Sequence, residues 1–479
     1  MTTPMLTLHV PQVYSKELRL QHNAATDQRW LRISSNWLDA FGFSPNAPIA
    51  RTVLAPGQGL AITADPAGTT RVYRRRYTTR RSNPFETQLD LKGQQLLDAA
   101  FPGYIERVHV TFTPGRLSIV PVAERSAAIR TRQRRTPVPL TAFVAMSSGI
   151  DAACLAQLGF VTDHLLEYRP PEKRDRSEEK VRDLTETGVM TACHNTSFRH
   201  VWNEDLRRVS MDRIAAALNA GPGCGLLHLS LQCDDFSALK PKSLKARHLE
   251  DGDTTHDLVY DALRLIEAVA PASIIVENVP GFSSAEEGRL LLTKLRRFGY
   301  HVSTMIGDAR EFGGATSRKR FYVVASVFPG FRMPTPPMAQ RPAGWVWNEL
   351  VADLLHECRD VTDNVSVRLG FETGRIRLLT PESSSAPTVT KSQSRMTKDA
   401  LYLRDVDGRV RFPSERVLQR LNGIPASFSF AATSSELAQE QIGQSIDWDL
   451  HEAIAKAVRD HLLTNWSDGA QHQLWLPGA

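Results

Sequence analysis

Hydrophobic positions follow two alternating periods along the longer, later part of this 479-residue chain. Beyond about residue 140, short apolar runs alternate with stretches in which apolar residues recur every three or four positions. The runs are AFVAM, GLLHLSL, SIIVENV and RFYVVASVF, and the periodic stretches are 211–218, 257–270 and 287–298. Buried strands that alternate with amphipathic helices predict a doubly wound, mainly parallel, Rossmann-like α/β sheet.

The first 125 residues instead contain short strands in an order that occurs twice. A strand, a helix ending near Gly42 and strands around 50–53 and 60–63 are followed by another strand, a helix ending at 101–102 and a hairpin over 108–120. Two such copies predict a small β-rich α+β domain that folds as one swapped barrel. The pattern resembles that of SymE-like or AbrB-like transcription-factor barrels.

These patterns divide the chain into five segments. A basic, proline-bearing stretch follows the barrel, and we interpret it as a linker. Prolines and serines gather between about 330 and 400 with weak periodicity, which indicates a short insertion in the α/β domain. The predicted segments are 1–125, 126–139, 140–330, 331–400 and 401–479. The last segment, with a helix over 437–463, is expected to complete the α/β domain.

Composition narrows the class of protein. Hydrophobic residues make up 42% of the chain, and nowhere do some 18 apolar residues run together. The start, MTTPMLTLHV, lacks the basic and apolar stretches of a secretory signal. The five cysteines include no C-x-x-C pair. We therefore expect a folded cytoplasmic protein with no membrane segment, no disulfide and no structural metal.

Positive charge is concentrated in the first part of the chain. Residues 1–136 hold 19 Lys and Arg against 9 Asp and Glu, whereas the remainder holds 39 against 43. Two clusters flank the barrel and suit a phosphate backbone, although arginines that only keep a linker soluble would give the same pattern. The arginines expected to contact nucleic acid are Arg74, Arg75, Arg76, Arg80, Arg81, Arg130, Arg132, Arg134 and Arg135.

Two reactive side chains follow neighbouring apolar runs. Cys233 comes directly after GLLHLSLQ, and Glu277 ends the run SIIVE, with one predicted helix between them. Because the carboxyl ends of parallel strands meet at one edge of a sheet, this spacing predicts a thiol and a carboxyl group in one site. The other four cysteines are expected to be packed or incidental.

Five segments together resemble the motifs of DNA (cytosine-5) methyltransferases. SIIVENVPGF is similar to the ENV motif, LQCDDFS stands in the place of PPCQxFS, and GGATSRKRFYVVAS is similar to the QxRxR strand. Near the end, RLNGIPASF resembles the RLQGFP segment, and EQIGQSIDWDLHEAIAKAV resembles the final EQIGNAVPVPVARAI helix. The resemblance covers roughly residues 140–465, and the inserted segment would then be a target-recognition insertion.

The resemblance implies a covalent mechanism on an extruded cytosine. C5 of cytosine is a poor nucleophile, so a thiolate first adds to C6 and pushes electron density onto C5. Cys233 would be this nucleophile. Glu277 would contact N3 and the exocyclic amine, where negative charge grows. Arg318 and Arg320 would hold the base and the surroundings of Glu277.

The family also implies S-adenosyl-L-methionine as methyl donor. TAFVAMSSGIDAACLAQLGF matches the first motif in place and length, Glu167 stands where the family uses an acid on the ribose hydroxyls, and Asp205 where it contacts the adenine amine. Any one of these acids could also be a helix cap. The expected donor-binding residues are Ser147, Ser148, Gly149, Ile150, Glu167, Tyr168, Asp205, Leu206, Gln444 and Ser445.

Several positions depart from the family pattern and keep alternatives open. Leu231 and Gln232 replace the prolines before the nucleophile, Asp234 replaces Gln, Thr316 replaces the first residue of QxRxR, and Ala145 replaces the aromatic residue of the first motif. The carboxylates of Asp234 and Asp235 beside a polyanion must be neutralised or turned away. A modified donor and a loss of catalysis with retained binding are the alternatives that these departures leave open.

Three functions suit these observations. The favoured one is methyl transfer to double-stranded DNA by a nucleoid-associated enzyme of a bacterial-type cell, as in restriction-modification systems, with the target base flipped out of the stack. An enzyme acting on RNA is the second. The third is a regulator whose barrel binds an operator while the methyltransferase fold is vestigial. The insertion favours DNA over RNA.

Overall fold

The structure is a computed structural model that divides the chain into two compact units, Met1–Arg125 and Ser126–Ala479. It describes residues 9–23, 28–79, 84–101, 103, 105–122, 124–171, 184–232, 234–236, 243, 247, 249–251, 254–337 and 341–473. Cys233, Arg80 and Arg81 lie outside the described residues. Each unit has a hydrophobic core of its own and is described by itself.

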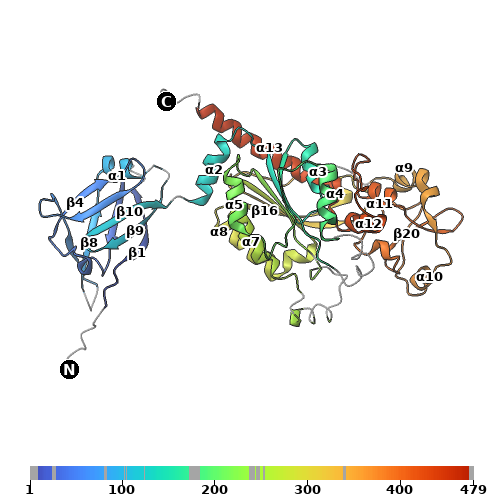
Figure 1. Cartoon of the computed structure of the whole chain (residues 1–479), viewed down its shortest axis with the longest axis horizontal. Coiled ribbons are helices and arrows are strands. Elements are labelled where there is room, and N and C mark those ends of the chain that lie inside the picture. Colours follow the sequence, from blue (N-terminus) through green and yellow to red (C-terminus); the bar gives the residue numbers. More distant parts are fainter. Residues whose placement is uncertain are drawn as a thin grey trace. The chain divides into compact units, whose positions relative to one another are not determined.

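Strands dominate the described part of the first unit, together with one α-helix and one 3-10 turn (Figure 1). They are β1 Tyr14–Arg19, β2 Gln21–Asn23, β3 Gln28–Ser34, η1 Asp39–Phe41, β4 Pro48–Val53, β5 Leu60–Ala64, β6 Thr70–Arg71, β7 Tyr73–Arg76, β8 Phe85–Leu91, α1 Gln94–Ala100, β9 Arg107–Thr113 and β10 Arg116–Val122. The helix expected before Gly42 is only the turn η1, because Gly42 adopts a left-handed conformation (φ 92°) and ends it.

In the first unit, strands of one sequence copy pair with strands of the other. Its sheets have the orders β1-β9-β10-β5-β4-β6 and β2-β3-β8-β7, so β3 pairs with β8 and β5 with β10. β1, which precedes the first copy, pairs with β9, and β6, which lies between the two copies, pairs with β4. The residues that recur between the copies fill one core, as Leu60 and Ile62 face Leu117 and Ile119. Neither copy could bury these side chains alone.

The second unit is built on a seven-stranded sheet whose order along the chain is 3-2-1-4-5-7-6. The order β13-β12-β11-β14-β15-β17-β16 is parallel apart from β17, which runs antiparallel to both neighbours. The strands are β11 Thr141–Ala145, β12 Val161–Leu166, β13 His200–Trp202, β14 Leu226–Ser230, β15 Ser273–Asn278, β16 His301–Asp308 and β17 Lys319–Ser326. This confirms the predicted doubly wound sheet, and its order reverses between β11 and β14.

Helices cover both faces of this sheet (Figure 1). On one face lie α5, α7 and α8, and on the other α3, α4 and α13. Their bounds are α3 Ile150–Gln157, α4 Thr187–Asn195, α5 Met211–Asn219, α7 Leu258–Val269, α8 Glu286–Arg297 and α13 Trp448–Gln473. The predicted helices over 211–218, 257–270 and 287–298 are confirmed within two residues. No helix in the described ranges is both long enough and apolar enough to cross a bilayer.

The predicted linker is wrong in its first part, because residues Arg125–Arg135 form helix α2. Ile129 belongs to the core of the second unit, and the Gln133 amide donates to the carbonyl of Pro139 at 2.7 Å. Arg130 donates to the carbonyl of Val327 and Arg132 to that of Ala270. The basic composition predicts solvated chain, whereas the apolar and amide positions within it bind the helix to the α/β unit.

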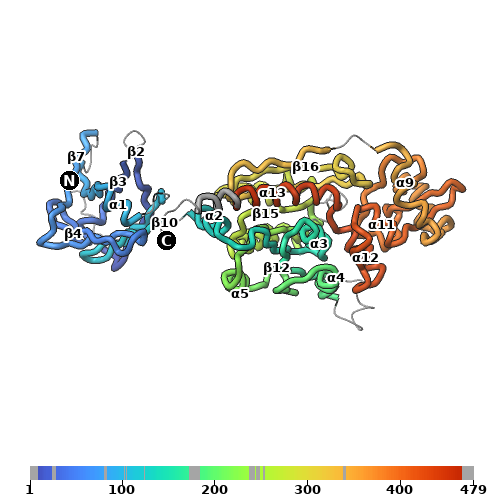
Figure 2. Tube along the Cα trace, turned by 90° about the horizontal axis from the view of Figure 1, so that it is seen from above, coloured from blue at the N-terminus to red at the C-terminus, as the bar shows by residue number. Residues whose placement is uncertain are grey.

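The insertion is longer than the predicted 331–400. A second sheet of order β18-β21-β20-β19 includes two strands beyond residue 400, since that hairpin pairs with β18 and β19. The elements are α9 Trp345–Leu350, η6 Ala352–Glu357, β18 Arg359–Asp360, α10 Val365–Glu372, β19 Arg377–Leu379, η7 Gln393–Arg395, β20 Leu401–Arg404, β21 Val410–Phe412 and α11 Glu415–Leu421. Figure 2 shows this part at one end of the second unit.

The single helix predicted over 437–463 is also corrected. It is two helices, α12 Ser435–Gln444 and α13, because Ser445 is extended (ψ 172°) and interrupts the helical bonding. The interruption is stabilised from outside, since the carbonyl of Ser445 accepts a hydrogen bond from Arg318. The break is therefore held by a residue distant in sequence and is not a fraying of the helix.

Candidate active site

Glu277 lies at the carboxyl end of β15 and is almost fully buried. Its strand partner on β14 is Ser230, three residues before Cys233. Arg320 reaches it from the start of β17, with Nε 2.7 Å from the Glu277 carboxylate. Because β17 runs antiparallel to β15, its first residues and the last residues of β15 meet at one edge of the sheet. Arg320 is therefore in contact with Glu277, and its role in holding the base stays a prediction.

The segments on both sides of Cys233 are fixed to the turn that follows Glu277. The amide of Asn278 donates to the carbonyl of Leu231 at 3.1 Å. Phe236 packs edge-to-face on Phe282, with ring centroids 5.0 Å apart. Gly281 permits this approach, because a Cβ there would lie 2.3 Å from the carbonyl oxygen of Phe236. The described residues on either side of Cys233 thus lie against the ENV turn, although Leu231 and Gln232 replace the two prolines of the family pattern.

The two aspartates after Cys233 have different surroundings. Asp235 is buried and accepts hydrogen bonds from the Thr255 amide (2.7 Å) and from the hydroxyls of Thr254 and Thr255. Asp234 is exposed. The carboxylate of Asp235 is therefore turned into the protein, where it orders the loop and does not confront a polyanion.

Arg318 has a structural position that the sequence did not suggest. Its side chain is fully buried and donates to the backbone carbonyls of Val389, Gly443 and Ser445. These carbonyls belong to the insertion and to the end of α12. Arg318 thus joins β17 to two segments that are distant in sequence, whereas a direct contact with the base remains a prediction.

A cavity opens at the carboxyl ends of the strands, beside the point where the strand order reverses. Ligands in open α/β sheets bind at this position. The cavity is lined by Met146, Leu166, Tyr168, Pro170, Glu204, Asp205, Leu206, Arg207, Gln232 and Leu258. It joins three predicted donor-binding residues, Tyr168, Asp205 and Leu206, to Gln232, the neighbour of Cys233. Gln232 and Glu204 were not predicted as site residues, and only the place of Gln232 in the nucleophile loop could have suggested it.

Asp205 combines a binding position with a local structural role. It accepts a hydrogen bond from the amide of Arg207 at 2.9 Å, as in an aspartate-stabilised turn. Arg207 in turn pairs with Asp257 at the start of α7 (2.8 Å). Asp205 thus stabilises a turn and does not cap a helix, since the N-cap of the next helix is Ser210, and the same side chain lines the cavity.

The turn Ser147–Ile150 between β11 and α3, here called the donor turn, is tightly fixed. Gly149 has φ 97°, and a Cβ on it would lie 2.5 Å from Ala192 of α4. Ser147 accepts from the amide of Gly149 and donates to Asp151. The lining of the cavity includes Met146, which precedes the donor turn, but none of Ser147, Ser148, Gly149 and Ile150, whose donor-binding role stays a prediction.

Glu167 follows β12 on the other side of the same turn. Burial, and secondly the negative charge of Asp151, raise the pKa of Glu167 to about 8. Gly188 makes room for it, since a Cβ there would meet the Glu167 carboxyl at 2.4 Å. With this raised pKa, Glu167 is mainly protonated at neutral pH. It would accept hydrogen bonds from ribose hydroxyls more strongly once it is ionised.

Gln444 and Ser445 lie at the break between α12 and α13. Gln444 is exposed, and the Ser445 hydroxyl donates within its own turn to the carbonyl of Ile442 (2.8 Å). In the described part of the chain they do not line the cavity. Their donor-binding role stays a prediction.

Arginines of β7 lie on the surface of the first unit. Arg74, Arg75 and Arg76 are exposed. Arg74 stacks over Phe85 with its guanidinium carbon 4.0 Å from the ring centroid, and Arg75 lies over Tyr77 at 5.0 Å. Stacking on aromatic rings limits the freedom of the guanidinium groups and leaves their N–H edges open.

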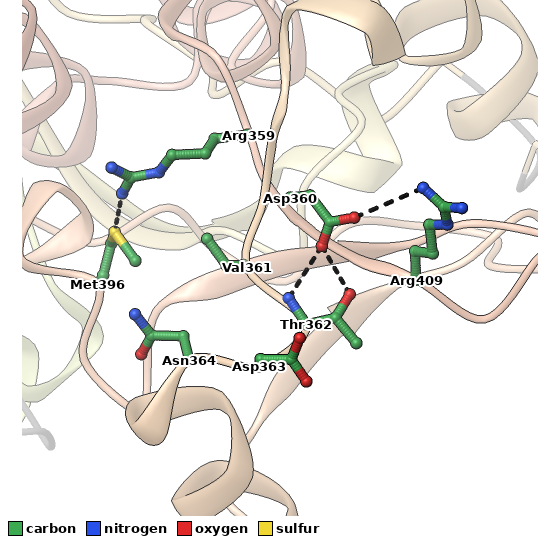
Figure 3. A pocket seen from close by; sticks show the side chains of 8 residues that line it. All are labelled: Arg359, Asp360, Val361, Thr362, Asp363, Asn364, Met396 and Arg409. Carbon is green, nitrogen blue, oxygen red and sulfur yellow. Dashed lines mark hydrogen bonds and ion pairs between the residues drawn. The ribbon is translucent and has the colours of Figure 1, made fainter.

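The insertion carries a polar hollow on its small sheet (Figure 3). Asp360 accepts from the amide and hydroxyl of Thr362 and lies 3.8 Å from Arg409. Arg359 points the other way, toward Met396. The lining residues are Arg359, Asp360, Val361, Thr362, Asp363, Asn364, Met396 and Arg409. Positively and negatively charged side chains thus lie side by side in the insertion, outside the main sheet.

Comparisons with known proteins agree with this arrangement. Residues 202–328 match the family model of C-5 cytosine-specific DNA methylases. The chain is 26% identical over 230 residues to the type II methyltransferase M1.ScrFI of Lactococcus lactis subsp. cremoris, covering 44% of this chain and 57% of that one. It is 23% identical over 246 residues to M.MspI of a Moraxella species, covering 50% and 56%. The chain spans about half the length of these curated relatives.

Solved structures share the fold. The chain is similar to the S. pombe Dnmt2 methyltransferase (TM-score 0.50, 18% identity, 67% of this chain and 99% of that one). It is also similar to the Entamoeba histolytica methyltransferase EhMeth (TM-score 0.52, 14% identity, 67% and 98%). The fold is thus that of Rossmann-like methyltransferases. The sequence matches support membership of the α/β unit in the C5 cytosine methyltransferase family.

Proposed function

We propose that the protein transfers a methyl group from S-adenosyl-L-methionine to C5 of cytosine in double-stranded DNA, through a covalent bond between Cys233 and C6. The observation that carries the proposal is the buried Glu277–Arg320 pair (2.7 Å) at the end of β15, beside the loop that contains Cys233. The match of residues 202–328 to the model of C-5 cytosine-specific DNA methylases favours DNA as substrate.

The chain's own residues supply the activation of the base. Addition of the Cys233 thiolate to C6 moves electron density through the ring toward C5 and N3. Glu277, fixed by Arg320, lies at the strand end where it can hold a proton at N3 and accept from the exocyclic amine. After methylation, loss of the C5 proton and departure of the thiolate restore the aromatic ring.

The residues around the cavity suit the proposed donor, whose contribution when bound is an electrophilic methyl group. Tyr168 offers a flat face for adenine and Asp205 a carboxylate for its amine, and both line the cavity. Glu167, the neighbour of Tyr168 in sequence, would supply a carboxyl for ribose hydroxyls. Their place at the reversal of strand order agrees with the general rule for ligands of such sheets. Gln232 would place the nucleophile loop next to the bound donor.

The two basic or mixed surfaces would complete DNA binding. Exposed Arg74, Arg75 and Arg76 suit contacts with phosphates, which position DNA without reading sequence. The hollow that contains Arg359 and Arg409 suits contacts with base edges, which specify sequence. The insertion would then act as the target-recognition segment.

Methyl transfer from a radiolabelled donor tests the proposal. The full chain is incubated with plasmid DNA from a methylation-deficient host, with the same DNA denatured, and with transfer RNA. Label is expected in duplex DNA, and base-resolution sequencing should place it on cytosine. Label in RNA alone would replace DNA as the substrate, and no label in any of them would overturn the proposal.

Two separate cysteine substitutions test the mechanism, one at the proposed nucleophile and one as a control. Cys233→Ala should abolish transfer while DNA binding in a gel-shift assay persists, because the thiolate contributes the covalent step and little binding energy. Cys193→Ala, at an exposed cysteine of α4, should leave transfer unchanged. Wild-type transfer by the Cys233 variant would refute the assignment of the nucleophile.

A further inference from the structure

A buried carboxylate that was not predicted as a site residue joins the two halves of the site. Asp151, in the first turn of α3, is 3% exposed. Ser147 of the donor turn donates to its Oδ1, and Nδ1 of His228 lies 2.8 Å from its Oδ2. His228 belongs to β14, the strand that leads to Cys233. One side chain therefore bridges the two strands between which the strand order reverses.

The same carboxylate reaches the last residue of β14. The hydroxyl of Ser230 donates to Oδ2 of Asp151 at 3.4 Å. Ser230 is also the partner of Glu277 in the β14–β15 register. A displacement of Asp151 would thus move the donor turn and the two strand ends that carry the proposed chemistry.

The surroundings of Asp151 keep it charged and in place. Burial alone would raise its pKa, but His228 and the Ser147 hydroxyl lower the pKa of Asp151 to about 2. His228 is fully buried, and the ring of His451 from α13 packs edge-on against it at 4.8 Å. Burial lowers the pKa of His451 to about 3, so it is neutral there. The contact holds its geometry in the dry interior, because separating Asp151 from His228 would leave the buried carboxylate without this partner.

We propose that Asp151 and His228 are positioning residues that couple the donor turn to the strand end of the nucleophile, so that donor occupancy changes the reactivity of Cys233. The proposal rests on the proposed function for the identity of donor and nucleophile. Well-packed interiors transmit such displacements, and coupling between sites in proteins is typically 5- to 150-fold.

Alkylation of Cys233 measures this coupling without DNA and without knowledge of the target sequence. Iodoacetamide is added to the full chain with and without S-adenosylhomocysteine, and the rate at Cys233 is followed by mass spectrometry of its peptide. Exposed Cys193 in the same chain is the internal reference. In the wild type, S-adenosylhomocysteine should slow alkylation of Cys233 by about fivefold or more relative to Cys193.

His228→Leu should bring that ratio close to one. The bond between Ser147 and Asp151 does not involve His228, so calorimetry should find S-adenosylhomocysteine bound within a few-fold of the wild-type affinity. His228→Asn keeps an N–H donor near the position of Nδ1 but lacks the imidazole ring, and its ratio should lie between the two. If the Leu variant does not fold, the Asn variant decides: a ratio equal to that of the wild type would overturn the proposal.

His164→Leu is the matched control. His164 is a buried imidazole on β12 of the same sheet, packed against Trp202 and Phe143, and burial lowers its pKa to about 4. Its replacement should lower the melting temperature but keep the wild-type ratio. An unchanged ratio in His228→Leu would show that the donor acts on the thiol directly. Absence of S-adenosylhomocysteine binding to the wild type would remove the proposed function itself.

Discussion

Arginines of the two units occupy opposite environments. On β7, Arg74, Arg75 and Arg76 are exposed and rest on aromatic rings. In the α/β unit, the side chain of Arg320 is 12% exposed and pairs with a carboxylate, while that of Arg318 is fully buried and binds backbone carbonyls. The arginines of β7 therefore mark a surface, whereas Arg318, just before β17, and Arg320, within it, hold buried segments together.

The buried side of this comparison is tested most strongly at Glu277. Glu277→Gln keeps size and hydrogen bonding but can neither pair with Arg320 as a charge nor supply a proton at N3. We expect methyl transfer to fall by roughly 10²- to 10⁴-fold, the usual contribution of a general acid. Initial rates with labelled donor measure this. Urea unfolding serves as the control, since a variant that loses stability but retains specific activity would show a purely structural role.

The next effect concerns Arg318. Arg318→Leu leaves the carbonyls of Val389, Gly443 and Ser445 without this donor in a buried place. Each buried acceptor that loses its partner costs about 1 to 3 kcal/mol, so the free energy of unfolding should fall by roughly 3 kcal/mol or more. Arg76→Ala on the surface should change it by less than about 0.5 kcal/mol. Equal effects of the two substitutions would break the comparison.

The sequence predicted the fold of the α/β unit well because its strands are continuous apolar runs. The contact of Arg320 with Glu277 agrees with what the family resemblance implied, and the strand pattern alone did not predict it. The sequence missed the Asp151–His228 pair, since a polar residue within GLLHLSL carries no local signal of its partner. It missed helix α2 for a related reason: a high arginine content hid Ile129 and Gln133, whose burial depends on tertiary contacts.

The exposed side of the comparison is tested by salt. Replacing Arg74, Arg75 and Arg76 with alanine should weaken DNA binding and reduce the slope of log affinity against log salt by up to about 2.7, at about 0.9 for each phosphate that is no longer neutralised. Fluorescence titrations with duplex DNA at several salt concentrations measure the slope. Arg19 and Arg107 form ion pairs with Glu106 and Glu17 in the same unit, so their double alanine variant should keep it.

A deletion of the first unit complements these variants, and it must end before helix α2 begins at Arg125. Removing residues 1–124 keeps Ile129 and the hydrogen bonds of Arg130 and Arg132 in the α/β unit. This shortened chain should show the flatter slope of the triple variant or a still flatter one. An unchanged slope in both proteins would indicate that the first unit binds a protein instead of DNA.

The smallest effect expected is a pH dependence from Glu167. Its pKa of about 8 lies above the ordinary value of 4.5, so the folded protein holds a proton there at neutral pH that the unfolded chain has released. This contribution to stability is complete below about pH 4.5 and disappears as the pH rises through 8. Ribose hydroxyls donate better to a carboxylate than to a carboxyl group, so affinity for S-adenosylhomocysteine should rise several-fold between about pH 6.5 and 8.5.

Calorimetry of wild type and Glu167→Gln at these two pH values isolates this effect. The amino group of the ligand and other groups of the protein, such as buried Asp447 with a pKa of about 7, titrate in the same range. They do so in both proteins, whereas the amide of the Gln variant does not titrate. The rise in affinity should therefore be steeper in the wild type. Parallel curves would mean that Glu167 does not accept from the ribose, and its high pKa would then reflect only its burial against Gly188 and the negative charge of Asp151.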